Sequence, residues 1–126
     1  MRVAIRPLLL ACCAAEVATA LAQPPALASV QWVEDEPEVT VVVIAGTITL
    51  AHVPLVQATV DAVTGPRAVV AYGVCASSGG PYWDSDTVLQ GWQAADLFVP
   101  GCPPPARVLW SSVVRAAEEA MARVRA

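Results

Sequence analysis

Several common signatures of function are missing from this sequence. It has no G-x-G-x-x-G run and no phosphate loop, so no nucleotide site is expected, and no Ser-His-Asp arrangement typical of a hydrolase. Lys and Arg together total seven and form no stripe with interleaved aromatics, which argues against nucleic-acid binding. Arg6, Glu16 or the Pro24-Pro25 pair interrupts every apolar stretch before it reaches the ~18 residues that a membrane span needs.

Charged residues are also scarce, at 14% of the chain against 56% hydrophobic residues. The 126 residues suit one domain, which we place at residues 1–126. Its core must be small, and domains of this size often depend on a metal centre or a partner. A composition this apolar predicts that part of the surface meets another subunit.

Apolar runs of strand type and of helix type alternate along most of the chain. Strands are expected at residues 39–45 (VTVVVIA), 68–72 (AVVAY) and 96–99 (DLFV), and helices at residues 52–63, 86–92 and 106–124. Residues 24–38, with the acidic run at 34–36, are expected to form a solvated connection. This alternation predicts an α/β fold: a flavodoxin-like, three-layer α/β/α sandwich with a small parallel sheet.

The main candidates for a functional site are the four cysteines, Cys12, Cys13, Cys75 and Cys102. Sites in parallel α/β folds form at the carboxyl ends of the strands. A cysteine closely follows the second expected strand, and another follows the third. We therefore expect Cys75 and Cys102 at the same edge of the sheet, in a convergent site.

On the residues alone, three kinds of cysteine site remain open. A [4Fe–4S] cluster needs four converging thiolates. Nearby glycines at positions 73, 79, 80 and 101 would let backbone N–H groups approach its sulfides. Zinc also binds four thiolates, although the C-x-x-C knuckles usual for zinc are missing. Two disulfides would suit an exported protein.

The first 23 residues carry two conflicting signals. Arg2 and Arg6, the apolar stretch that follows and residues 20–22 (ALA) resemble a secretory signal peptide, and residues 9–12 (LLAC) resemble a lipoprotein cleavage box. The competing interpretation is a helix that begins just after the Cys pair. Its Glu16 would put a carboxylate into any segment that must enter a membrane.

Four short motifs, in order, resemble those of the 20 kDa-type iron–sulfur subunit in the NADH:quinone oxidoreductase (complex I) family. They are residues 11–16 (ACCAAE), 44–49 (IAGTIT), 73–82 (GVCASSGGPY) and 98–104 (FVPGCPP). The tandem Cys pair is the specific element, because the related small subunits of membrane-bound [NiFe] hydrogenases usually separate those cysteines. The resemblance spans roughly residues 11–110.

This resemblance implies an electron-transfer subunit that carries one [4Fe–4S] cluster and passes electrons to quinone within an NADH:quinone oxidoreductase-like complex. By matching motif, Cys12, Cys13, Cys75 and Cys102 would be the ligands, and Glu16 matches the acidic residue after the pair. Partner subunits would oxidise NADH, and the chain would lie peripherally at the cytoplasmic face of the cell membrane. Residues 1–22 would then begin the mature domain.

Two alternatives accompany this expectation. One is a small subunit of a hydrogenase-related complex, because residues 24–38 are acidic and proline-bearing where family members carry Arg and His near the quinone site. The cluster is therefore better supported than quinone chemistry. The less favoured alternative is an exported lipoprotein stapled by disulfides.

Plainer roles are expected for the remaining polar and aromatic residues. His52, the only histidine, is expected to cap a helix or lie on the surface rather than carry protons. The other candidates are the loop carboxylates Asp84 and Asp86 and the indoles of Trp83, Trp92 and Trp110. The carboxylates would line a proton path or be solvated, and the indoles would pack in the core or against a partner.

Overall fold

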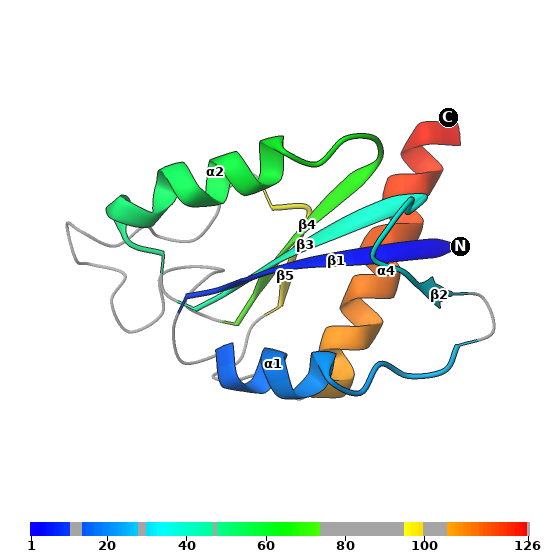
Figure 1. Ribbon diagram of the computed structural model, residues 1–126, viewed down its shortest axis with the longest axis horizontal. Helices are drawn as coiled ribbons and strands as arrows, with labels where there is room; N and C mark the ends of the chain where they lie inside the picture. Colours follow the sequence, from blue (N-terminus) through cyan, green and yellow to red (C-terminus); the bar gives the residue numbers. More distant parts are fainter. Residues whose placement is uncertain (11–13, 28–29, 47, 74–94, 100–105, 126) are drawn as a thin grey trace.

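The expected α/β fold is confirmed by a computed structural model (Figure 1). The structure describes residues 1–10, 14–27, 30–46, 48–73, 95–99 and 106–125. The strands are β1 (Arg2–Leu9), β2 (Gln31–Trp32), β3 (Val39–Ala45), β4 (Arg67–Tyr72) and β5 (Leu97–Val99). The helices are α1 (Ala14–Leu21), the short 3₁₀ helix η1 (Leu50–His52), α2 (Val53–Asp61) and α4 (Ala106–Arg125). The expected helix at residues 86–92 lies outside the described residues.

These five strands form one parallel sheet in the order β2-β1-β3-β4-β5. Strand β3 is buried along its whole length, as its run of β-branched residues predicts for a strand covered on both faces. Its neighbour β4 is buried at every position after Arg67. The two central strands were therefore predicted correctly from their apolar runs.

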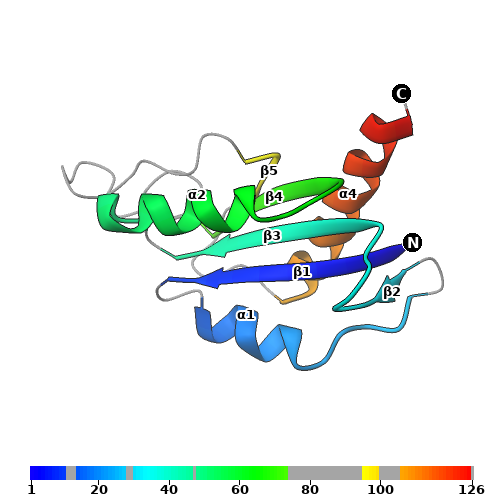
Figure 2. The same ribbon diagram turned by 45° about the horizontal axis from the view of Figure 1, so that its top comes forward.

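Helices cover both faces of the sheet and give it three layers (Figures 1 and 2). Alternate residues of β3 point to opposite faces, as the period of a strand requires. Val41 packs in the core beneath α1 and α4, where Leu109 of α4 is fully buried. Val42 packs on the other face against Val56 and Val60 of α2. The fold is therefore a three-layer α/β/α sandwich, as predicted.

The N-terminal segment corrects the sequence-based interpretation. Residues of the supposed signal peptide form β1, which lies between β2 and β3 and pairs with β3 along seven positions. Val3 and Leu8 of this strand are buried in the two separate core clusters. The helix predicted after the Cys pair is confirmed as α1. Residues 1–21 thus supply a strand and a helix to the folded domain.

The connection expected at residues 24–38 also contains a strand. Gln31 and Trp32 form β2 beside the first residues of β1. A strand of two residues has too short a pattern to be recognised in a sequence. The acidic residues 34–36 are all exposed, as expected for a solvated run. Within the described ranges, no helix has the length and hydropathy of a bilayer-spanning segment.

Candidate functional site

Four strands end on a single row across the sheet. Leu9, the last residue of β1, is in register with Ala45 of β3. Ala45 is in register with Tyr72 of β4, and Tyr72 with Val99 of β5. Each of the four is the last residue of its strand. The carboxyl ends of β1, β3, β4 and β5 therefore form one edge, where parallel α/β folds place their sites.

Just beyond this row, the chain turns away from the sheet at two glycines. Gly46 and Gly73 have positive φ angles of 106° and 94°, which residues with a Cβ adopt only at a cost. The Gly73 N–H donates to the Val99 carbonyl at 2.6 Å, and the Leu10 N–H donates to the Ala45 carbonyl at 2.8 Å. These bonds hold the strand ends in register up to the point where the loops begin.

Each segment that carries a cysteine follows one of these strand ends. Cys12, Cys75 and Cys102 stand three positions after the last residues of β1, β4 and β5, respectively. The two strands expected to precede Cys75 and Cys102 do end at one edge. The strand before the Cys pair, β1, was not predicted from the sequence. All four cysteines lie outside the described residues, as do Asp84, Asp86, Trp83 and Trp92.

Helix α1 begins directly after the Cys pair, and Glu16 is its third residue. Val17 and Ala20 anchor this helix in the core that α4 shares. The N-terminus of a helix presents free N–H groups and a partial positive charge. The fold therefore brings the amino end of α1 to the same edge of the sheet as the strand ends.

The roles expected for His52 and Trp110 can be compared with their surroundings. His52 precedes the first residue of α2, and its Nδ1 accepts a hydrogen bond from the Thr49 N–H at 3.4 Å. His52 therefore caps the short helix η1, whereas its side chain makes no capping bond to α2. The Trp110 ring lies against Trp32, with 5.0 Å between the ring centroids and 59° between the planes.

Among the described residues, no three His, Cys, Asp or Glu side chains gather in a way that would bind a metal.

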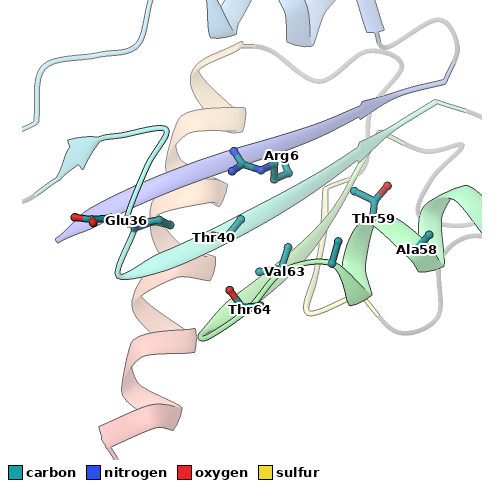
Figure 3. Close-up of a pocket in the computed structure, with 9 residues that line it drawn as sticks. Arg6, Glu36, Thr40, Ala58, Thr59, Val63 and Thr64 are labelled. Carbon is teal, nitrogen blue, oxygen red and sulfur yellow. The ribbon is translucent and has the colours of Figure 1, made fainter.

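A large cavity lies away from this edge, between α2 and the amino end of β3 (Figure 3). Its volume is about 630 Å³. Arg6 and Thr40 lie on the sheet side, Glu36 on the segment before β3, and Thr59 and Thr64 on or after α2. Thr40 is near the start of β3 and Thr64 precedes β4, so this cavity lies at the opposite end of the strands from the edge formed by Leu9, Ala45, Tyr72 and Val99.

Comparisons with known proteins agree with the family resemblance. A family model described as the 20 kDa subunit of NADH ubiquinone oxidoreductase matches residues 4–116. An NADH-quinone oxidoreductase subunit of Salinispora tropica is 34% identical over 122 residues, which cover 88% of this chain and 65% of the relative. A subunit of the same name in Streptomyces griseus is 31% identical, with coverages of 87% and 49%. The chain thus spans 65% and 49% of the lengths of these two relatives.

A solved structure shares the fold. It belongs to the membrane-bound sulfane sulfur reductase, described as an archaeal respiratory membrane complex. The TM-score is 0.61 at 16% sequence identity, and the match covers 95% of this chain and 70% of the other. At this identity the similarity concerns the fold, including the sheet whose strand ends form the edge described above.

Proposed function

Because the chain belongs to the family of the 20 kDa subunit of NADH ubiquinone oxidoreductase, we propose that it is an electron-transfer subunit of such a respiratory complex. In this proposal it carries one [4Fe–4S] cluster, held by the thiolates of Cys12, Cys13, Cys75 and Cys102. Bound there, the cluster accepts and donates single electrons. Catalysis needs partner subunits, because the chain itself has no nucleotide-binding motif for NADH.

The observation that carries this proposal is the common row of strand ends. Neighbouring strands lie about 4.8 Å apart, so β1 and β5, three positions apart in the sheet, are separated by about 14 Å at this row. Three residues of extended chain reach about 10 Å. Segments that start from the ends of β1 and β5 can therefore meet above β3 and β4. Cysteines three positions after each strand end fit one shared centre.

The groups around this edge suit a cluster of four thiolates. The positive φ angles at Gly46 and Gly73 let the backbone turn close to the site without a Cβ in the way. The amino end of α1 offers positive partial charge to a site rich in thiolates. Ala45 and Tyr72, the last residues of β3 and β4, are fully buried in the core directly below the edge. Burial on this side limits solvent access, which is one determinant of a cluster's potential.

Exposed leucines support a partner at this end of the molecule. Leu50 of η1 and Leu55 of α2 keep 53% and 52% of their surface exposed, and Leu9 keeps 41%. Leu9 ends β1, and the other two follow the end of β3. We propose that the surface that carries Leu50 and Leu55 contacts another subunit, at whose interface electrons pass to quinone. The chain would then be held through partners at the cytoplasmic face of the cell membrane.

A hydrogenase-related complex is the second candidate. It is favoured by the exposed acidic run at residues 34–36, since family members usually carry basic residues in this stretch near the quinone site. This alternative changes the electron acceptor and keeps the cluster. The exported, disulfide-stapled alternative has little support, because residues 1–21 form β1 and α1.

Serine substitutions test the ligand assignment directly. Cys12→Ser, Cys75→Ser and Cys102→Ser should each lower the iron and acid-labile sulfide of the purified complex to a small fraction of the wild-type content, while circular dichroism still shows α/β structure. Ala62→Ser, at the exposed end of α2, is the matched control and should keep full iron. A Cys75→Ser or Cys102→Ser variant with unchanged iron content would remove that residue from the ligand set.

A further inference from the structure

Strand β1 has an outer edge that is only partly paired. On its inner side, β3 pairs with seven successive residues from Val3 to Leu9. On its outer side, β2 pairs with Arg2 and Val3 alone. Figure 2 shows β2 as a short arrow near one end of the long β1 ribbon. Residues 5–9 therefore border no strand on the outer side within the described part of the chain.

Two hydrogen bonds show which backbone groups face the inner side. The Glu38 N–H donates to the Arg2 carbonyl at 2.9 Å, and the Leu10 N–H donates to the Ala45 carbonyl at 2.8 Å. Arg2 and Leu10 are both even-numbered, and their partners belong to β3 or directly precede it. Backbone groups alternate in direction along a strand. Even-numbered residues of β1 therefore bond to β3.

The odd-numbered residues face outward. The Val3 carbonyl accepts from the Val33 N–H, just after β2, at 3.0 Å. By the same alternation, the N–H and carbonyl groups of Ile5 and Leu9 and the carbonyl of Pro7 point to the outer side. None of these groups has a hydrogen-bond partner among the described residues. This edge thus offers donors and acceptors at the two-residue period of an extended chain.

Pro7 agrees with this assignment. Proline has no N–H and is tolerated in a strand where its nitrogen faces an unpaired edge. Its position is odd-numbered, so its missing donor costs β1 no bond to β3. Pro7 therefore offers no N–H donor at the outer edge, but the N–H groups of Ile5 and Leu9 on either side of it remain.

An apolar cavity of about 350 Å³ opens beside this edge, on the face of α1 and α4. Its lining includes Ile5, Pro7, Leu21, Pro24, Trp32 and Trp110. The two indoles form a tilted pair, and the Trp32 Nε1–H donates to the Pro25 carbonyl at 2.9 Å, which fixes that ring. A strand added beside β1 would place alternate side chains over this cavity.

The rim of the cavity is acidic. Glu34 lines it and Asp35 follows along the chain, whereas Glu36 lines the cavity on the α2 side. None of the three forms an ion pair with another described residue. The chain as a whole has a net charge of −4. Two copies meeting at this edge would bring like charges together, whereas a basic segment would be attracted.

We propose that the outer edge of β1 receives an extended segment of a partner subunit, which adds a sixth strand to the sheet. Its backbone bonds to Ile5, Pro7 and Leu9, one large apolar side chain fills the cavity, and Lys or Arg residues lie opposite Glu34 and Asp35. The added stretch is short, on the order of three to five residues. This inference rests on the edge and the cavity alone and does not require the cluster.

Amide hydrogen exchange within the purified complex tests the added strand. The Leu8 and Leu10 amides face β3 and serve as internal references. If a strand is added, the Ile5 and Leu9 amides exchange as slowly as these references, within about tenfold. If Ile5 and Leu9 exchange a hundredfold or more faster than the references, no strand covers the edge and the proposal is wrong. Iron content plays no part in this readout.

A photo-crosslinking residue at Pro7, placed in the assembled complex, identifies the occupant. The expected product joins β1 to a segment of another subunit that carries a large apolar residue and flanking basic residues. Crosslinks to a second copy of this chain, or the absence of any crosslink to another subunit, would overturn the proposed occupant.

A charge reversal tests the acidic rim. Glu34→Lys should weaken the association of that partner at least tenfold at low salt, with Glu118→Lys on the exposed surface of α4 as the control. Equal weakening by both variants would also count against it.

Discussion

Gly65 shows how one residue constrains the chain between α2 and β4. Its φ angle is 85°, and a Cβ built there would meet no atom within 4 Å. Any penalty for a side chain at this position therefore comes from the backbone conformation and not from a clash. The residue precedes the amino end of β4, away from the edge formed by the carboxyl ends of the strands, so its effect concerns stability alone.

Gly65→Ala should lower the free energy of unfolding by about 1 kcal/mol, because a left-handed conformation costs residues with a Cβ roughly that much. Urea denaturation of the two proteins measures the change. Gly65→Asn should lose less, since Asn tolerates this conformation better. An alanine variant as stable as the wild type would show that this turn relaxes.

Two leucines, one buried and one half-exposed, allow the contribution of core packing to stability to be measured. Leu109 of α4 is fully buried, and Leu55 of α2 is about half exposed. Leu109→Ala should cost about 2–5 kcal/mol, the range for a buried leucine that leaves a cavity. Leu55→Ala should change stability by no more than about 0.5 kcal/mol. Denaturation midpoints compare them, and similar losses for both would contradict the assignment of the core.

At the scale of elements, Asp96 joins two strands and a helix. Asp96 directly precedes the first residue of β5. Its Oδ2 accepts a hydrogen bond from the Val69 N–H of β4 at 2.7 Å. Its Oδ1 lies 3.0 Å from the Arg123 guanidinium of α4. Strand β5 has only three residues, and Asp96 adds a side-chain hydrogen bond to β4 and an ion pair to α4 at this side of the sheet.

Asp96→Ala should cost about 1–3 kcal/mol, because the Val69 N–H loses its acceptor. Arg123→Ala should cost less, no more than about 1 kcal/mol, since it removes an exposed ion pair. Thermal or urea denaturation ranks the two variants. A larger loss in the arginine variant would mean that the ion pair, and not the backbone bond, joins these elements.

Strands β1 and β3 show where sequence patterns predict elements and where they fail. Strand β3 was predicted correctly because burial on both faces leaves a continuous β-branched run. Strand β1 was missed because Arg6 and Pro7 interrupt its apolar run. The structure explains both residues: Arg6 is exposed on the α2 side, and Pro7 lies on an unpaired edge. A partly covered edge strand has no pattern that separates it from a signal peptide.

At the scale of the whole molecule, the missed strand also hid part of the candidate site. The sequence placed Cys75 and Cys102 at one edge, because each follows a recognisable strand. The Cys pair could be added only through the family resemblance, since β1 was not recognised as a strand. The common row of Leu9, Tyr72 and Val99 depends on strand register, which arises from pairing between distant segments and is not visible in any one of them.

The N-terminal segment is integral to this architecture. A chain that lacks residues 1–22 would lose α1 and β1, the strand that lies between β2 and β3 in the sheet. We expect such a chain to remain unfolded, as measured by circular dichroism and limited proteolysis. A compact, protease-resistant fold without these residues would restore the signal-peptide interpretation.

We propose that the edge formed by the carboxyl ends of β1, β3, β4 and β5 supports one [4Fe–4S] cluster. The most direct measurement is the iron and acid-labile sulfide content, together with low-temperature EPR, of protein purified anaerobically with its partner subunits. The account predicts about four irons and about four sulfides per chain, with a reducible cubane signal. Protein without iron, whose cysteines are disulfide-bonded or bound to zinc, would contradict it.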